Sequence, residues 1–209
     1  MNGQLVIVVG ASGAGKDSLL RWLEQHLAAE RGRHANIRIA TRWITRTAHA
    51  SERHHTVDDA RFAAMLAADE FALHWSANGA RYGVGREIDA WLALGDTVVV
   101  NGSRAHLPQA AALYPQTHAV HVQVNAQVLA RRLQGRGRET AEEVQARLAR
   151  HAALDAPLAL APGRVTVIDN DGELEDAGRA LLHHLRELTR PVPRDPPAIA
   201  LDRQRMPSH

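Results

Sequence analysis

Cysteine, lysine and aromatic residues are scarce in this sequence of 209 residues. The absence of cysteine excludes disulfides and thiolate metal sites, and it fits a reducing compartment. Aromatic residues make up only 4% of the chain, so few side chains could stack on the bases of single-stranded nucleic acid. The formal net charge is only +2, although the chain has 25 lysines and arginines. We therefore expect no nucleic-acid partner.

Long apolar runs are missing too. No stretch approaches the length of a membrane-spanning helix, and the N-terminus lacks the pattern of a secretory signal. We expect a cytoplasmic protein without a membrane partner, and the sequence leaves a homodimer open. With 45% hydrophobic residues the chain can bury a core, and its length suits one α/β domain with an insertion.

The sequence is organised around residues 5–20, LVIVVGASGAGKDSLL. An apolar run, a glycine-rich turn and an alternation of polar residues and leucines predict a strand, a loop and a helix. The pattern G-x-x-x-x-G-K is complete at Gly10, Gly15 and Lys16, so the loop is predicted to hold the phosphates of ATP. Glycine-rich turns also join strands to helices in proteins that bind no nucleotide, which is the alternative. The residues expected to contact the nucleotide are Gly10, Ala11, Ser12, Gly13, Ala14, Gly15, Lys16, Asp17 and Ser18.

Lys16 is the only lysine among the 25 basic residues, and it occupies the position where phosphate chemistry needs a compact ammonium group. Asp17 follows it, where the usual motif has a Ser or Thr hydroxyl as a magnesium ligand. We expect Asp17, Ser18 or both to support Mg²⁺. Alternatively, Asp17 only favours the N-terminus of the helix.

The rest of the chain alternates between helix and strand signals. We predict strands at 37–41, 71–75, 97–100, 119–124 and 165–168. Helices are predicted at 17–29, 57–68, 88–94, 106–113 and 174–188, and a helix, a loop and a second helix are predicted over 128–154. The stretch 76–85 has the composition of a hairpin or a loop, and the proline-rich residues 191–209 are predicted to form a disordered tail.

Three polar stretches are candidates for binding. Asn101, Ser103 and Arg104 follow a buried strand, where open α/β sheets bind ligands. Residues 41–55 are rich in arginine and histidine, and they form either an anion-binding wall or a solvated basic loop. Arginines around the glycines at 135 and 137 could close over a phosphoryl group as a lid, or they could pair with glutamates on an ordinary helix surface.

Over residues 5–188 the chain resembles the guanylate-kinase-like branch of the nucleoside monophosphate kinases. The likeness is carried by GASGAGKDSLL, RWITR, FALHWSANGARYGV, VVVNGSRAHLP and LARRLQGRGRE. Within this branch, GKDS and NGSRA are similar to the ribose 1,5-bisphosphate phosphokinases of bacterial phosphonate breakdown. The resemblance implies an α/β P-loop kinase domain over 1–190, with a parallel sheet flanked by helices. It also implies an acceptor-binding insertion at about 42–90 and a lid at about 132–142.

The match to true guanylate kinases is incomplete on the acceptor side. Thr45 and Arg46 resemble the start of their phosphate-binding segment, but His49 stands where a second arginine is expected. The pair Tyr82 and Gly83 matches their Y-G. Leu73 and His74 lie where those enzymes carry a guanine-binding glutamate, and Asn101 stands near an expected aspartate. The resemblance thus implies an acceptor with phosphates and a sugar but no guanine.

The activity implied is transfer of the ATP γ-phosphoryl group to the 1-phosphate of ribose 1,5-bisphosphate, with Mg²⁺, giving 5-phosphoribosyl 1-diphosphate and ADP. A guanylate or other nucleoside monophosphate kinase and a non-catalytic interaction module are the alternatives. The catalytic candidates are Lys16, Arg136, Arg138 and Arg147, and Arg132 is expected at the nucleotide. The candidates for binding the phosphorylated ribose are Arg42, Arg46, Tyr82, Asn101, Ser103 and Arg104.

Overall fold

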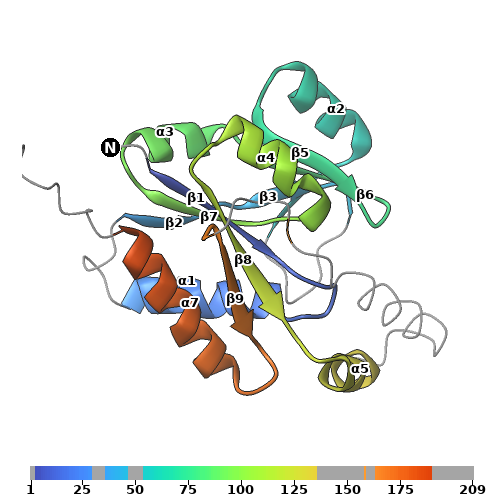
Figure 1. Cartoon of the computed structure of the whole chain (residues 1–209). Coiled ribbons are helices and arrows are strands. Elements are labelled where there is room, and N and C mark those ends of the chain that lie inside the picture. Colours follow the sequence, from blue (N-terminus) through green and yellow to red (C-terminus); the bar gives the residue numbers. More distant parts are fainter. Residues whose placement is uncertain (1–2, 30–35, 47–53, 136–157, 159–162, 190–209) are drawn as a thin grey trace, which may run out of the picture.

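The computed structural model describes residues 3–29, 36–46, 54–135, 158 and 163–189, which contain two β-sheets with helices packed on them (Figure 1). The main sheet has the strand order β2-β7-β1-β8-β9, and every neighbouring pair in it is parallel. This arrangement confirms the predicted α/β fold with a parallel sheet. The strands are β1 (Gln4–Val9), β2 (Ile37–Ile39), β7 (Thr97–Asn101), β8 (Thr117–Gln123) and β9 (Val165–Asp169).

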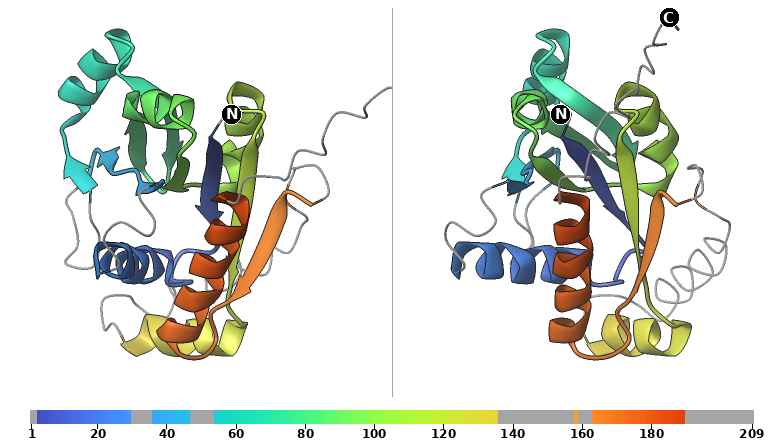
Figure 2. Two further views of the ribbon diagram at one scale, coloured as in Figure 1. Left: turned by 90° about the vertical axis from the view of Figure 1, so that its left-hand side faces the viewer. Right: turned by 60° about the vertical axis from the view of Figure 1, so that its left-hand side comes forward.

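Both faces of the main sheet are covered, as the continuous apolar run of β1 predicts. Val6 and Val8 pack in a core with leucines of α1 (Lys16–Ala29) and α7 (Leu174–Thr189), which lie side by side in Figures 1 and 2. The alternate residues of β1 pack in a second core with α3 (Glu87–Ala93), α4 (Leu107–Leu113) and the second sheet. Because successive side chains of a strand point to opposite faces of the sheet, both faces of β1 are buried.

The carboxyl ends of the parallel strands share one edge of the main sheet. The glycine-rich loop follows β1 there, and the Gly102 N–H after β7 donates to Val8 O at 2.9 Å. Asn170 follows β9, and its N–H donates to Gln123 O of β8 at 2.9 Å. Residues far apart in the sequence thus meet beside the loop, as expected for ligand binding in open α/β sheets.

The second sheet has the order β4-β3-β6-β5, with β4 parallel to β3 and the other pairs antiparallel. Its hairpin turns at Asn78 and Gly79, whose φ angles of 50° and 72° are those favoured in two-residue hairpin loops. Residues 76–85 therefore form a hairpin. The elements of this part are β3 (Arg42–Ile44), β4 (His54–Thr56), α2 (Asp59–Ala67), β5 (Phe71–Ala77) and β6 (Ala80–Gly85).

The other predicted elements within the described residues are present, with small differences at their ends. The strand predicted at 37–41 ends at Ile39, and α2 begins at Asp59 because Asp58 caps it by accepting a hydrogen bond from the Arg61 N–H. The helix predicted from residue 106 is preceded by a 3₁₀ turn, η1 (Arg104–His106). The interpretation of 41–55 as loop was wrong in part, because β3 and the first two residues of β4 lie within it.

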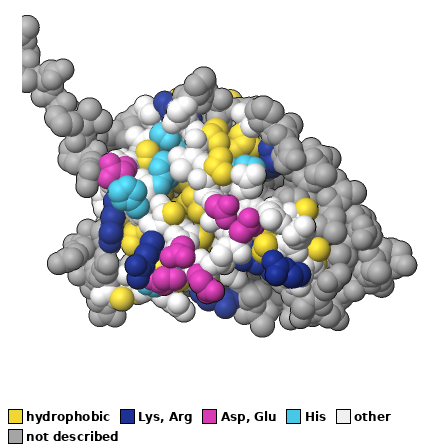
Figure 3. All heavy atoms as spheres, turned by 60° about the horizontal axis from the view of Figure 1, so that its bottom comes forward, with side chains coloured by type: hydrophobic (Ala, Val, Ile, Leu, Met, Phe, Trp, Pro, Cys, Tyr) yellow, Lys and Arg dark blue, Asp and Glu magenta, His cyan; other side chains and the backbone are white. Residues whose placement is uncertain are grey.

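Some predictions lie outside the described residues. They include the second helix of the segment 128–154, most of the predicted lid and the tail 191–209, whereas the first helix of that segment is present as α5 (Ala126–Gly135). No described helix combines the length and the apolar character needed to cross a bilayer. On the face shown in Figure 3, acidic and basic side chains of the described residues are interspersed, in keeping with the small net charge.

Candidate active site

The glycine-rich loop has the backbone that its glycines predict. Gly13 and Gly15 have φ angles of 93° and 92°, in the region where side chains are strained. The ammonium of Lys16 bends back over the loop, and Nζ donates to Gly10 O and Ala11 O, both at 2.9 Å. The only lysine of the chain is therefore fixed against the loop that would hold the phosphates.

Two elements hold this loop from outside. A Cβ on Gly13 would lie 2.9 Å from Leu129 Cδ1 of α5, and one on Gly15 would lie 3.8 Å from Arg132 Nη1 of the same helix. Asn170 is only 2% exposed, and its Nδ2 donates to Ala14 O at 2.6 Å. The helix α5 and the residue after β9 therefore pack directly against the loop, and α5 brings Arg132 close to it.

Asp17 connects the loop to the two sheets. Its Oδ1 accepts a hydrogen bond from Arg42 Nη2 of β3 at 3.1 Å and from Asn101 Nδ2 of β7 at 2.7 Å. The side chain of Arg42 is 10% exposed, whereas that of Asp17 is 34% exposed. The pairing neutralises a buried guanidinium, which would be costly without a negative partner.

A column of stacked side chains continues from Arg42. The Arg42 guanidinium lies 5.7 Å from the centre of the Tyr82 ring, which stacks on Trp75 at 5.3 Å with an interplanar angle of 3°. Trp75 in turn stacks on His106 at 5.1 Å. Burial is the main cause that lowers the pKa of His106, and the charge of His74 adds to it. Burial therefore favours the neutral form of His106.

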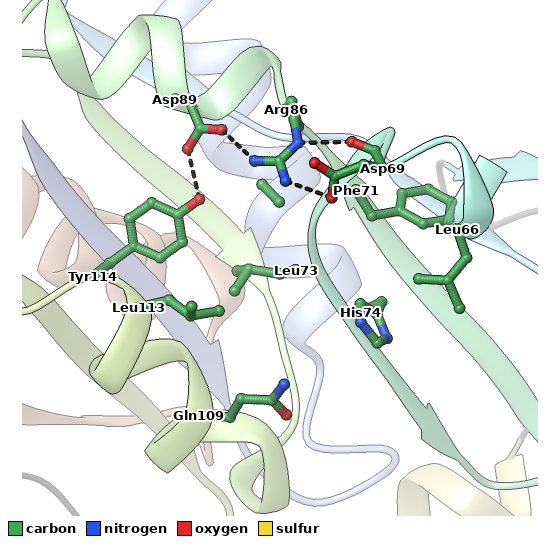
Figure 4. Close-up of a pocket in the computed structure, with 11 residues that line it drawn as sticks. Leu66, Asp69, Phe71, Leu73, His74, Arg86, Asp89, Gln109, Leu113 and Tyr114 are labelled. Atoms are coloured by element: carbon green, nitrogen blue, oxygen red, sulfur yellow. Dashed lines mark hydrogen bonds and ion pairs between the residues drawn. The ribbon is translucent and has the colours of Figure 1, made fainter.

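Two pockets in the described part of the chain can be compared with the predicted site. A small one of about 90 Å³ is lined by Asp17, Arg42 and Asn101 among others. A larger one of about 450 Å³ lies between α2, β5, α3 and α4 (Figure 4) and contains none of the site residues predicted from sequence. Across its rim Arg86 pairs with Asp69 and Asp89, and the Tyr114 hydroxyl donates to Asp89 Oδ1 at 2.6 Å. The small pocket, rather than the larger one, adjoins the loop.

A family model described as Guanylate kinase matches residues 2–187. The chain belongs to the guanylate kinase family. It is 50% identical over 187 residues to ribose 1,5-bisphosphate phosphokinase PhnN of Burkholderia mallei, covering 90% of this chain and 97% of that protein. It is 45% identical over 186 residues to the PhnN of Thiobacillus denitrificans, covering 88% and 94%. The likeness to the ribose 1,5-bisphosphate phosphokinases within the guanylate kinase family is thereby confirmed.

A solved structure supports the fold of this guanylate kinase family member. Guanylate kinase from Anaplasma phagocytophilum matches with a TM-score of 0.61 at 17% identity, over 89% of this chain and 86% of that one. At this identity the match shows the shared fold only. The predicted P-loop kinase fold is confirmed by it and by the family model.

The structure brings together several residues that the sequence proposed for different roles. Asp17, proposed for the metal, contacts Arg42 and Asn101, proposed for the acceptor, and Tyr82 adjoins Arg42. The loop residues from Gly10 to Gly15 lead directly into Lys16, Asp17 and Ser18 of α1, and Arg132 lies beside the loop. For three other candidates the structure gives a local position. The backbone O of Arg46 accepts a hydrogen bond from the His54 ring, and Ser103 and Arg104 lie at the start of η1. Arg136, Arg138, Arg147 and His49 lie outside the described residues.

Three residues of this site were missed from sequence. Trp75 and His106 complete the stacked column, and Asn170 holds the loop. The sequence gives one usable signal for Asn170, because it directly follows an apolar strand run, as Asn101 does. For the stack, the two-residue turn at Asn78 and Gly79 places Trp75 opposite Tyr82, whereas Arg42 and His106 come from other elements and have no such signal.

Proposed function

We propose that this protein transfers the γ-phosphoryl group of ATP to the 1-phosphate of ribose 1,5-bisphosphate, giving 5-phosphoribosyl 1-diphosphate and ADP. The observation that carries the proposal is the contrast between the two sides of the site. The loop around Lys16 is intact on the donor side. On the acceptor side Leu73 is 1% exposed in the core, and the amide nitrogen of Asn101 is bound to Asp17.

This contrast favours a phosphorylated sugar over a guanine nucleotide. A guanine presents N–H donors, and a site that selects it needs an acidic acceptor, which neither leucine nor asparagine provides. Arginines remain on the acceptor side, and guanidinium groups bind phosphates through paired hydrogen bonds. The relatives at 45–50% identity bear the name of the same activity.

The chemistry needs positioning more than a strong base. An oxygen of the acceptor 1-phosphate forms a bond to the γ-phosphorus while the bond from that phosphorus to the β–γ bridging oxygen breaks, and ADP leaves. The attacking phosphate oxygen is already anionic, so Lys16 and the arginines have mainly to align the two phosphates and neutralise their charge. Arg132 is close to the loop, and Arg136, Arg138 and Arg147 remain proposals for the lid.

Asp17 and Ser18 would hold Mg²⁺, because both carry the oxygen ligands that this ion prefers and both lie on the first turn of α1 beside Lys16. The ion supplies neutralisation of the phosphate oxygens. The hydrogen bonds of Asp17 to Arg42 and Asn101 point its carboxylate toward β3 and β7 in this structure.

The test is a comparison of acceptors with the purified protein, ATP and Mg²⁺. We expect turnover with ribose 1,5-bisphosphate and formation of 5-phosphoribosyl 1-diphosphate, detected by ³¹P NMR, and little turnover with GMP or ribose 5-phosphate. Lys16→Ala is the inactive control, since loss of a group that stabilises transition-state charge costs about 10²- to 10³-fold or more. A preference for GMP would overturn the proposed acceptor.

A further inference from the structure

One carboxylate lies between the two places where phosphates are expected to bind. Asp17 directly follows Lys16 in α1, and its Oδ1 accepts hydrogen bonds from Arg42 Nη2 at 3.1 Å and from Asn101 Nδ2 at 2.7 Å. Arg42 belongs to the second sheet and Asn101 to the main sheet. A single oxygen atom therefore connects the loop on the donor side with two elements on the acceptor side.

Asp17 offers Arg42 the same chemistry as an acceptor phosphate. The Arg42 side chain is 10% exposed, and a guanidinium removed from water needs a negative charge and hydrogen-bond acceptors in place of the water. The carboxylate supplies both from within the chain. A phosphate oxygen on the acceptor would bind the same guanidinium through the same kind of charge-assisted hydrogen bond. Asp17 and the acceptor are thus alternative partners of Arg42.

Asp17 is also within the donor side. It follows the residue whose ammonium lies over the loop carbonyls, and its side chain is 34% exposed, so it has room to change its rotamer. Rotation of this side chain toward the nucleotide breaks its hydrogen bonds with Arg42 and Asn101, because one oxygen makes both of them. The position of one side chain therefore affects both halves of the site.

We propose that Asp17 is a positioning residue that couples the binding of the two substrates, an inference that rests on the proposed function. In the free protein Asp17 neutralises Arg42 and holds it in place. Mg²⁺ bound with the donor nucleotide would attract the Asp17 carboxylate, which then turns away from Arg42 and leaves it to the acceptor phosphate. Because coupling between two ligands is reciprocal, an acceptor bound to Arg42 leaves Asp17 to the nucleotide side and tightens nucleotide binding by the same factor.

The test measures binding without turnover. Ribose 1,5-bisphosphate is titrated by calorimetry into the protein alone and into the protein saturated with ADP and Mg²⁺. We expect the wild-type protein to bind it roughly 5- to 20-fold more tightly when the nucleotide is present. In Asp17→Asn the acceptor should bind more tightly to the nucleotide-free protein, and the ratio of the two affinities should approach one.

Two further variants separate the coupling from unrelated effects. Asp17→Ser introduces the side chain that usually follows the loop lysine, so the loop should tolerate it, and we again expect the coupling to be lost. Asp59→Asn is the matched control, because it also removes one negative charge from a residue beside the second sheet. The Asp59 side chain is 78% exposed, and its ion pair with Arg81 is long, at 3.9 Å. This control should keep the wild-type ratio.

Two results would overturn the coupling: a wild-type ratio of one, or a wild-type ratio retained in both Asp17 variants. A different result, in which ribose 1,5-bisphosphate neither binds nor reacts, would contradict the proposed function instead. In that case inorganic phosphate becomes the probe. Tighter binding of phosphate to Asp17→Asn than to wild type supports the exchange at Arg42, and equal binding overturns it.

Discussion

At the scale of single residues, Gly15 is a position where the loop has little freedom. Its φ angle is 92°, and a Cβ there would lie 2.5 Å from Asn170 Nδ2, which itself is bound to Ala14 O. Substitution therefore strains the backbone and also displaces the side chain that holds the loop. Gly10 and Gly13 of the same loop also combine a positive φ angle with a neighbour within 3.0 Å of an added Cβ.

We predict that Gly15→Ala weakens ATP binding at least tenfold and lowers the melting temperature. The matched control is Gly79→Ala in the β5–β6 hairpin, which has a φ angle of 72° but no atom within 4 Å of the added Cβ. Gly79→Ala should cost about 1–2 kcal/mol from the left-handed backbone alone and leave ATP affinity unchanged. Calorimetric titration of ATP and thermal unfolding test this. Equal effects of the two variants on ATP affinity would contradict the role of Asn170.

The loop could be predicted from sequence because it is local. The pattern from Gly10 to Lys16 needs only neighbouring residues, and its backbone follows from where the glycines stand. The partners of Asp17 could not be predicted, since Arg42 and Asn101 are 25 and 84 residues away in the chain and meet it only through the order of the strands. Sequence therefore gave candidates for this cluster without their mutual contact.

At the scale of elements, features set by neighbouring residues were predicted, and features set by contacts between distant residues were not. The β5–β6 hairpin was expected as a hairpin or loop, because Asn78 and Gly79 mark a tight turn. The strands β3 and β4 have three residues each, which is too short for an alternation of polar and apolar residues to be recognised. Their pairing with each other and with β6 depends on contacts that arise only in the folded chain.

The second sheet supports Arg42 through its aromatic stack, so we predict that Trp75→Ala raises the KM for the acceptor about tenfold and leaves the KM for ATP unchanged. Removing the ring deprives Tyr82, which contacts Arg42, of its stacking partner. The control is Trp22→Ala, which removes a tryptophan that also stacks on a histidine, His26, in the core between α1 and α7. It should lower stability and change neither KM. Steady-state kinetics with each substrate varied in turn distinguish the two variants, and an unchanged acceptor KM in Trp75→Ala would refute the supporting role.

At the scale of the whole molecule, burial of histidines links stability to pH. The pKa values of His106, His118 and His184 are lowered chiefly by burial, with nearby positive groups adding to the effect. In the unfolded chain these side chains titrate near pH 6.5, so the unfolded state binds more protons than the folded state below that pH. The free energy of unfolding therefore decreases as the solution becomes more acidic.

We therefore predict that the free energy of unfolding is constant above about pH 7 and falls as the pH is lowered from 6.5 toward 5. The double variant His118→Gln, His184→Gln should reduce this fall, because the burial of His118 on β8 and His184 on α7 makes their protonation costly in the folded state. His55→Gln, at an exposed residue of β4, is the control and should keep the wild-type dependence. Urea denaturation at pH 7.5, 6.5, 5.5 and 5.0 measures the effect. Equal slopes in the double variant and the wild type would show that another group, outside this pair, is responsible for the acid sensitivity.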